Sequence, residues 1–288
     1  MTLWTVLWLT LPFLVGFSIY LIPRIDRILA LGVALVSMAY ALALFWQPEP
    51  LSFAWLDSFG VTLLADHLSA FFIITNALVT AAVILYCWDS GKTAFFYGQI
   101  IILHGSVNAT FICADLISLY VALEVIGVAA FLLIAYPRSN RNLWVALRYL
   151  FVSNTAMLFY LVGAALVYQS QQSFAFSALQ GAPLDAIALM FLGLLTKGGI
   201  FMSGLWLPLT HSESETPVSA LLSGVVVKAG VFPLVRCALM LEDLDPVVRF
   251  FGAATALLGV VYAVFEKDTK RMLAFHTVSQ MGFVLAAP

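Results

Sequence analysis

The chain has 288 residues, of which 63% are hydrophobic and 10% are charged, and its mean hydropathy is +1.03. This composition excludes a soluble globular domain of the ordinary type, and a formal net charge of −2 gives no electrostatic basis for binding nucleic acid. Runs of ~18 or more apolar residues can cross a bilayer, and the chain contains about ten of them. The sequence therefore predicts an all-α, multi-pass membrane protein that lies in the lipid bilayer.

The first half of the chain is predicted to contain five membrane helices. Pro23 ends the first of them and Pro137 ends the fifth, and the linker 47–60 is rich in Pro and Gly. Asp115 stands just ahead of the fifth helix, where we expect it to cap the helix rather than bind an ion. The predicted ranges are about 3–22, 28–46, 62–88, 94–112 and 116–136.

The second half is predicted to contain five more helices. A basic loop precedes the sixth helix, and a polar, glutamine-rich linker at 169–183 follows it. The tenth helix begins near Lys270 and is still running at Pro288. The ranges of the other four are about 142–168, 184–207, 216–239 and 246–264.

Basic residues in the loops predict the orientation of the helices, because cytoplasmic loops carry an excess of Lys and Arg. Alternate loops hold nine basic residues on one side and only Arg236 and Arg249 on the other. We therefore expect the N-terminus to lie outside a prokaryotic cell membrane or an equivalent energy-transducing membrane. No basic segment precedes the first helix, so a cleaved signal peptide is not predicted. The nine residues are Arg24, Arg27, Lys92, Arg138, Arg141, Arg148, Lys267, Lys270 and Arg271.

Two lysines, Lys197 and Lys228, fit in no loop, and Glu124 lies near the middle of the fifth helix. An ionisable side chain at such a depth costs about 2.5–3.5 kcal/mol on insertion scales. We therefore expect Glu124 to meet a lysine, most simply Lys197, inside the bundle. A carboxylate that approaches and retreats switches a lysine between holding and releasing a proton, as a proton relay requires. Two other interpretations are snorkelling of the lysines to the interface and a purely structural Glu–Lys clamp.

Helix-weakening residues follow both lysines. Gly198 and Gly199 come directly after the first, while Gly230 and Pro233 come shortly after the second. Glycine and proline in membrane helices often serve packing alone. Their repetition beside both lysines favours broken helices that take part in ion translocation.

The histidines are the remaining candidates for proton chemistry. His211 lies in the connection between the seventh and eighth helices, where it is either solvated beside the acidic SESE segment or a proton-entry residue. His104 and His276 are expected to be hydrogen-bonded packing residues, and His67 is expected to be interfacial.

No cofactor or metal ion is expected. Cys87, Cys113 and Cys237 are far apart, so they indicate neither a disulfide framework nor a metal site. The sequence has no paired helix histidines at haem spacing and no nucleotide-binding glycine loop. A redox enzyme that acts directly is therefore disfavoured.

Several segments resemble one family of membrane proteins. In chain order they read ADLISLYVALE, TKGGIFMSGLWLP, TPVSALLSGVVVKAGVFPLVR and DTKRMLAFHTVSQMGFVL. They resemble the antiporter-type subunits shared by respiratory complex I and the multisubunit Mrp-type Na+/H+ antiporters. The HTVSQMGF and GVVVKAG segments look closest to the D subunit of the Mrp complexes. The similarity covers most of the chain from the third helix on.

The resemblance implies a fold of fourteen transmembrane helices that contains two inverted five-helix repeats with broken helices. It implies that Glu124 is the family's helix-5 glutamate, Lys197 its broken helix-7 lysine and Lys228 its helix-8 lysine. His211 stands where relatives have a connecting histidine, although the SESE segment departs from the family's usual wording. The family's subunits work in complexes and bind no redox centre themselves.

The same resemblance divides the chain into three parts. Residues 1–93 correspond to helices 1–3, residues 94–240 to the first repeat (helices 4–8), and residues 241–288 to the start of the second repeat (helices 9–10). Most of the second repeat and its charged helix-12 residue are missing from the chain. We therefore expect a fragment, a truncated gene product or one half of a split subunit.

The leading hypothesis is a proton-translocating subunit of a cation/proton antiporter, in which Glu124 tunes Lys197 and protons pass toward Lys228. Its partners are other membrane subunits, H+ with or without Na+, and lipid, but no nucleic acid. The close alternative is a proton-pumping membrane subunit of an NADH- or ferredoxin-dependent quinone oxidoreductase or of a membrane hydrogenase, not catalytic by itself. A third hypothesis is a non-conducting structural fragment whose charges only hold helices together.

Overall fold

Helices account for most of the chain, in agreement with the predicted all-α membrane fold. The computed structural model describes residues 2–55, 61–241 and 243–287. The first half contains α1 (Thr2–Ser18), α2 (Asp26–Phe45), β1 (Leu51–Trp55), β2 (Val61–Ala65), α3 (His67–Tyr86), α4 (Ala94–Ile112), α5 (Leu116–Ile134) and α6 (Asn140–Gln171). The second half contains η1 (Phe176–Gly181), α7 (Leu184–Lys197), η2 (Phe201–Gly204), α8 (Trp206–Glu213), α9 (Thr216–Leu221), η3 (Leu222–Val226), α10 (Val227–Met240), α11 (Asp245–Phe265) and α12 (Thr269–Ala286).

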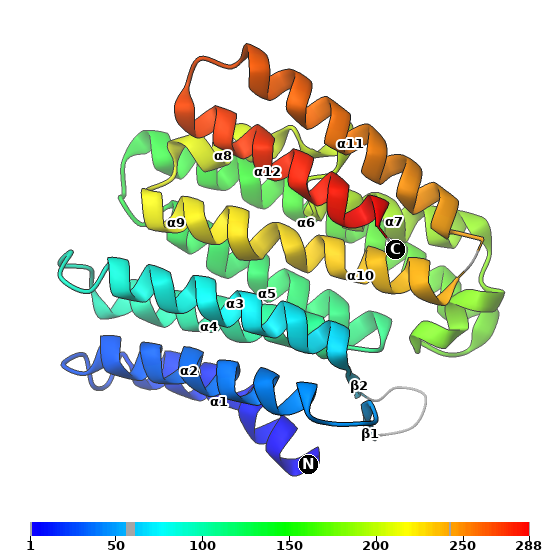
Figure 1. The fold of residues 1–288 in the computed structure, drawn as a ribbon, viewed down its shortest axis with the longest axis horizontal. Helices are drawn as coiled ribbons and strands as arrows, with labels where there is room; N and C mark the ends of the chain where they lie inside the picture. The colour runs from blue at the N-terminus through cyan, green and yellow to red at the C-terminus, as the bar shows by residue number, and fades with distance from the viewer. Residues whose placement is uncertain (1, 56–60, 242, 288) are drawn as a thin grey trace.

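The helices form two packed rows. One row runs α2, α3, α9–α10, α12 and α11, and these helices lie side by side (Figure 1). The other runs α1, α4, α5, α6 and α7 behind it, and α10 contacts both α4 and α7 across the rows. Helix α10 is therefore central: it touches the row that carries Glu124 and Lys197 and itself carries Lys228.

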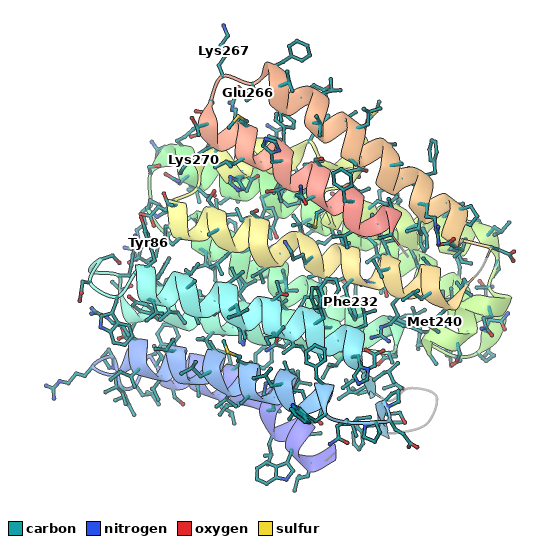
Figure 2. All side chains as sticks on the ribbon, viewed as in Figure 1. Tyr86, Phe232, Met240, Glu266, Lys267 and Lys270 are labelled. Carbon is teal, nitrogen blue, oxygen red and sulfur yellow. The ribbon has the colours of Figure 1, made fainter. Side chains whose placement is uncertain are left out.

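The two ends of the bundle carry different side chains. Tyr86, Glu266, Lys267 and Lys270 lie toward one end, whereas Met240 lies toward the opposite end (Figure 2). The first end holds the α3–α4 and α11–α12 turns, whose basic residues predict the cytoplasmic side. Apolar side chains are exposed along the outer faces, as expected of helices surrounded by lipid.

Seven helical segments of the described residues are long and apolar enough to cross a membrane, and an eighth if the bent pair Leu184–Lys197 and Met202–Glu213 is one span. Each of the ten predicted helices corresponds to a helical segment, but the number that meets both criteria is lower than ten. Helix α1 is too short. Helix α12 is less apolar, because it carries polar residues that line a cavity described below.

A short hairpin precedes α3, because strand β1 pairs antiparallel with β2. The predicted third helix, about 62–88, therefore begins a few residues later than its outer bound, at His67. The physical reason is the cap: the Asp66 carboxylate accepts a hydrogen bond from the Ser69 N–H at 2.8 Å and so sets the first turn of α3. The predicted cap at Asp115 is confirmed, because its carboxylate accepts from the Ser118 N–H at 2.7 Å.

Candidate functional site

Lys197 is buried at the C-terminal end of α7, with 2% of its surface exposed. Its ammonium donates a hydrogen bond to the hydroxyl of Ser153 on α6. The ammonium also lies beside Gly127 of α5, where an added Cβ atom would come within 3.1 Å of Nζ. The side chain therefore points into the bundle and does not reach the membrane interface.

Helix α7 ends directly after Lys197, as the sequence predicts. Gly199 has φ of +69°, a left-handed conformation that glycine adopts without strain, and the next helical segment is bent away by 43°. The carbonyl oxygen of Thr196 accepts hydrogen bonds from the Gly199 N–H at 3.2 Å and the Trp206 indole N–H at 2.8 Å. The backbone carbonyl that the break leaves free is thus hydrogen-bonded within the protein, as is required at membrane depth.

Glu124 is half-buried on α5, one turn before Gly127. Within the described residues its carboxylate forms no hydrogen bond and no ion pair within 4 Å, so the predicted direct meeting with Lys197 is not found. Lys197 has a hydroxyl partner instead of a carboxylate partner, because Ser153 is closer to its ammonium.

Lys228 is half-buried near the start of α10. Its ammonium donates to the backbone carbonyl oxygen of Ser223 at 3.0 Å. Ser223 belongs to the π-helical segment η3, and such a segment frees carbonyl groups from the regular helical pattern. The lysine therefore satisfies one carbonyl that the irregular turn leaves available.

The helix distortion beside Lys228 lies on the opposite side from the one predicted. Helix α10 continues through Pro233, whereas the π-helical segment comes before the lysine. Gly230 serves a different purpose: an added Cβ atom would lie 2.3 Å from the backbone nitrogen of Gly198. The absence of a side chain at Gly230 therefore allows α10 to pack directly on the break of α7.

A cavity of about 440 Å³ opens beside Lys228. Residues of α8, α9, η3, α10 and α12 line it, and no carboxylate is among the described lining residues. The polar lining residues are His211, Thr216, Ser219, Ser223, Lys228, Lys270, His276, Thr277 and Gln280. The amines and imidazoles among them are groups that can exchange protons.

His211 lies within α8 rather than in a loop, and it is 6% exposed. Its Nδ1 atom lies 2.7 Å from the hydroxyl of Ser219. The expectation of a solvated histidine beside an acidic residue is therefore wrong, because the helix carries the ring inward. The ring does face the cavity that also contains Lys228.

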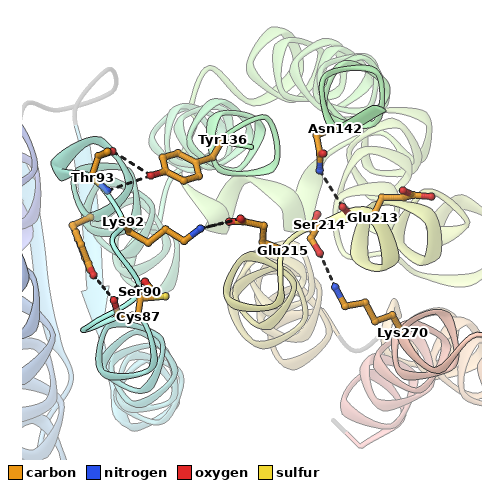
Figure 3. A network of polar contacts seen from close by, with 11 residues as sticks. Cys87, Ser90, Lys92, Thr93, Tyr136, Asn142, Glu213, Ser214, Glu215 and Lys270 are labelled. Carbon is orange, nitrogen blue, oxygen red and sulfur yellow. Dashed lines mark hydrogen bonds and ion pairs between the residues drawn. The ribbon is translucent and has the colours of Figure 1, made fainter. Parts of the chain in front are cut away.

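The acidic turn between α8 and α9 is fixed from three sides (Figure 3). Lys92 forms an ion pair with Glu215 at 2.7 Å, and Lys270 donates to the carbonyl oxygen of Ser214 at 2.8 Å. Asn142 donates to the carbonyl oxygen of Glu213 at 3.1 Å. The SESE segment therefore joins the α3–α4 turn, α6 and α12 at the end of the bundle where the cavity has Lys270 in its wall.

Arg236 was predicted to lie in a loop, and the structure corrects this. It lies inside α10 and is 5% exposed. Its guanidinium forms two hydrogen bonds with the Asp66 carboxylate, at 3.0 and 3.1 Å. Burial alone would raise the pKa of Asp66, but the hydrogen bonds and charge of Arg236 and the Ser69 N–H lower it below its usual range. An apolar helix does not reveal such a partner, so the sequence reading missed this clamp.

The predicted packing role is found for His104 but not for His276, which is exposed rather than packed. His104 is 1% exposed, and its ring lies 3.2 Å from the Thr80 hydroxyl and 2.9 Å from the Ser37 hydroxyl. His67 is exposed and contacts the carbonyl oxygen of Gln47. His276 differs in that it lines the cavity beside Lys228. The three cysteines are buried and unpaired.

The two rows of helices and the buried amines define a multi-pass membrane protein with ionisable groups in its interior. The family model described as NADH:quinone oxidoreductase/Mrp antiporter, TM, matches residues 113–288, which is more than half of the chain. The chain therefore belongs to this family.

Two curated relatives represent the two branches that the family name contains. In Alkalihalophilus pseudofirmus, the D subunit of the Na(+)/H(+) antiporter is 26% identical over 96% of this chain and 61% of its own length. The NAD(P)H-quinone oxidoreductase chain 4 2 of Trichodesmium erythraeum is 31% identical over 96% of this chain and 56% of its own length. The chain thus spans somewhat more than half the length of the relatives it matches.

A solved structure shares the fold. A chain of the Mrp complex from Dietzia sp. DQ12-45-1b superposes with a TM-score of 0.90 at 23% identity, over 99% of this chain and 59% of that chain. The structural neighbour is part of a multisubunit membrane complex, and an antiporter-like membrane subunit is the class that fold and family together define.

Proposed function

We propose that the chain is the proton-translocating membrane subunit, or part of it, of a multisubunit cation/proton antiporter of the Na+/H+ type. The observation that carries this proposal is the fully buried ammonium of Lys197, which lies at a helix break and has no carboxylate within 4 Å in the described residues. A buried amine without a counter-ion is costly. Such a group is expected to serve in ion movement rather than in stability.

The route that we propose begins at the cavity. Lys270 and His211 stand with Lys228 in its wall, and Gly230 brings α10 against the break that follows Lys197. Lys228 and Lys197 are therefore carried on backbone segments in direct contact. Protons pass along water in the cavity to Lys228 and then, through the packed region, to Lys197 under the influence of Glu124.

The test is Glu124→Gln in the assembled complex. Proton transfer by a positioned group typically contributes about 10²–10⁴-fold, so we expect ΔpH-driven exchange in everted vesicles to fall by about 10²-fold while the complex still assembles. Glu49→Gln is the matched control, because Glu49 is an exposed carboxylate outside the helices, and it should leave exchange unchanged. Exchange at the normal rate in the Glu124 variant refutes the proposal.

A second candidate is a proton-pumping membrane subunit of a quinone oxidoreductase. The 31% identity to the NAD(P)H-quinone oxidoreductase chain favours it, and the same lysines serve both activities. An assay in vesicles distinguishes the two activities. An antiporter dissipates an imposed ΔpH when Na+ is added, whereas a redox pump builds a ΔpH only when an electron donor and a quinone are supplied. The proposed orientation places the N-terminus outside the cell membrane in either case.

A further inference from the structure

The contact between Lys197 and Ser153 joins two helices inside the bundle. Ser153 is 4% exposed and Lys197 is 2% exposed, so water from outside the bundle does not compete with the hydrogen bond. A hydroxyl can accept a hydrogen bond from an ammonium without taking its charge or its proton. Ser153 is therefore a neutral resting partner for the ammonium of Lys197.

Gly127 supplies the space that this arrangement needs. A Cβ atom at Gly127 would come within 3.1 Å of the Lys197 Nζ and 3.2 Å of the Ser153 Oγ, which is tighter than ordinary contact. Glu124 lies three residues earlier on the same face of α5, about 4.5 Å along the helix axis at 1.5 Å per residue. A rotation within the long lysine side chain spans that distance, and at Gly127 no side chain stands in the way.

The groups around the ammonium support a choice between two positions. The titratable groups nearby are Glu124 from α5 and Tyr149 from α6, and α10 packs against the break with Lys228 two residues before Gly230. The Tyr149 hydroxyl is buried one turn before Ser153 and has no hydrogen-bond partner of good geometry in the described parts of the chain. It is placed to hydrogen bond with the Ser153 hydroxyl when the lysine leaves.

We propose that Ser153 is a positioning residue that holds the Lys197 ammonium off Glu124, and that Lys197 alternates between the two during transport. The movement carries one positive charge along α5 past Gly127, and it neither makes nor breaks a covalent bond. Docked on Ser153, the ammonium leaves Glu124 free; docked on Glu124, it leaves the hydroxyl to Tyr149. This inference rests on the proposed function of the Glu124 and Lys197 pair and names the second position that the pair requires.

The experiment compares variants of equal shape. Ser153→Thr keeps the hydroxyl, whereas Ser153→Val has the same shape without it, and Ser153→Ala only removes the oxygen atom. A hydrogen bond to a charged group is a strong one. We expect ΔpH-driven exchange in the intact complex to stay within about twofold for threonine and to fall about tenfold for valine and alanine. Thr155→Val, an exposed position on the same helix, is the control and should leave exchange unchanged.

The outcomes separate this inference from the proposed function. Wild-type exchange in Ser153→Val and Ser153→Ala overturns the positioning role, and so does an equal loss in the threonine and valine variants. Failure of both the valine and alanine variants to assemble shows that the hydroxyl is structural and also overturns it. If Ser153 variants behave like the wild type while Glu124→Gln loses exchange, the proposed function stands and only the second position falls.

Discussion

Lys197 and Lys228 are both amines inside the bundle beside an irregular helix, yet they are held in different ways. Lys197 is fully buried and bound by the side-chain hydroxyl of Ser153. Lys228 is half-buried, faces a cavity of about 440 Å³ and is bound by the backbone carbonyl of Ser223. A side chain changes rotamer easily, whereas a backbone carbonyl moves only with its helix.

The comparison indicates a division of labour between the two lysines. The Lys197 region has the parts of a switch, namely a movable side chain, a hydroxyl and a carboxylate on the next turn. The Lys228 region instead has an ammonium that faces a cavity and is bound by a backbone carbonyl, which moves only with its helix. Helix α10 links them, because Gly230 packs on the break after Lys197 and Arg236 ties the other end of the helix to α3.

Gly230→Ala is expected to disturb the packing of α10 on the end of α7, and so both lysine regions, and to lower the stability of the protein more than any other change considered. Its Cβ atom would lie 2.3 Å from the Gly198 nitrogen, and backbone atoms cannot move aside as a flexible side chain does. Because overpacking in a tight core costs about 1–3 kcal/mol or more, we expect a destabilisation at or above the upper end of that range. The measurement is thermal unfolding of the purified protein in detergent.

The control for this change is Gly32→Ala on α2. An added Cβ atom at Gly32 meets no atom within 4 Å, and alanine is favoured over glycine in helices by about 1 kcal/mol. This variant should be as stable as the wild type or slightly more stable. A Gly230 variant that unfolds at the wild-type temperature contradicts the close packing of α10 on the break.

Asp66→Asn is expected to have the next largest effect, because it releases the end of α10 that lies beyond Lys228. The Arg236 side chain is 6% exposed, and Asp66 is its ion-pair partner. Removing one partner of a buried pair costs about 3–5 kcal/mol. Asp66→Asn should therefore lower the unfolding temperature, whereas Asp89→Asn, with its side chain 94% exposed, should not.

The same clamp predicts a dependence of wild-type stability on pH. The pKa of Asp66 is lower in the folded protein than in the unfolded chain, so the unfolded state binds more protons as pH falls. The stabilisation is complete above the ordinary carboxyl range and is lost as the pH falls below about 4 toward the folded pKa. The unfolding temperature of Asp66→Asn should lack this component, and identical pH profiles for the two proteins contradict the clamp.

The order of the helices and the existence of the break after Lys197 were predictable from sequence. Apolar runs, prolines and the Gly198-Gly199 pair are local signals, and so is the cap at Asp115. The depth of the two lysines followed from their position within apolar runs. These features depend on residues that are neighbours in the chain.

The partners of the buried charges were not predictable in the same way. Ser153 is 44 residues from Lys197, and Asp66 is 170 residues from Arg236. Nothing within α6 or α10 marks which helix packs against it. The sequence therefore predicted the Glu124 carboxylate as the partner of Lys197, whereas the fold supplies the Ser153 hydroxyl. The predicted helix break at Pro233 was wrong for a related reason. Tertiary packing keeps α10 continuous there and places the irregular turn before Lys228.

Replacing each lysine by methionine is expected to have the smallest effect on stability. The two variants together measure how much the cost of burying the ammonium differs between the two sites. Lys197→Met removes a buried ammonium whose insertion costs about 2.5–3.5 kcal/mol and loses a hydrogen bond to a charged group worth about 1.5–3 kcal/mol. The net gain is about 1 kcal/mol, or about 2–4 °C in unfolding temperature for a chain of this size. Lys228→Met should change it less, because that ammonium already faces the cavity, and Lys267→Met, at an exposed turn, should leave it unchanged. A larger gain at Lys228 than at Lys197 reverses the comparison, because it identifies Lys228 as the amine that is more costly to bury.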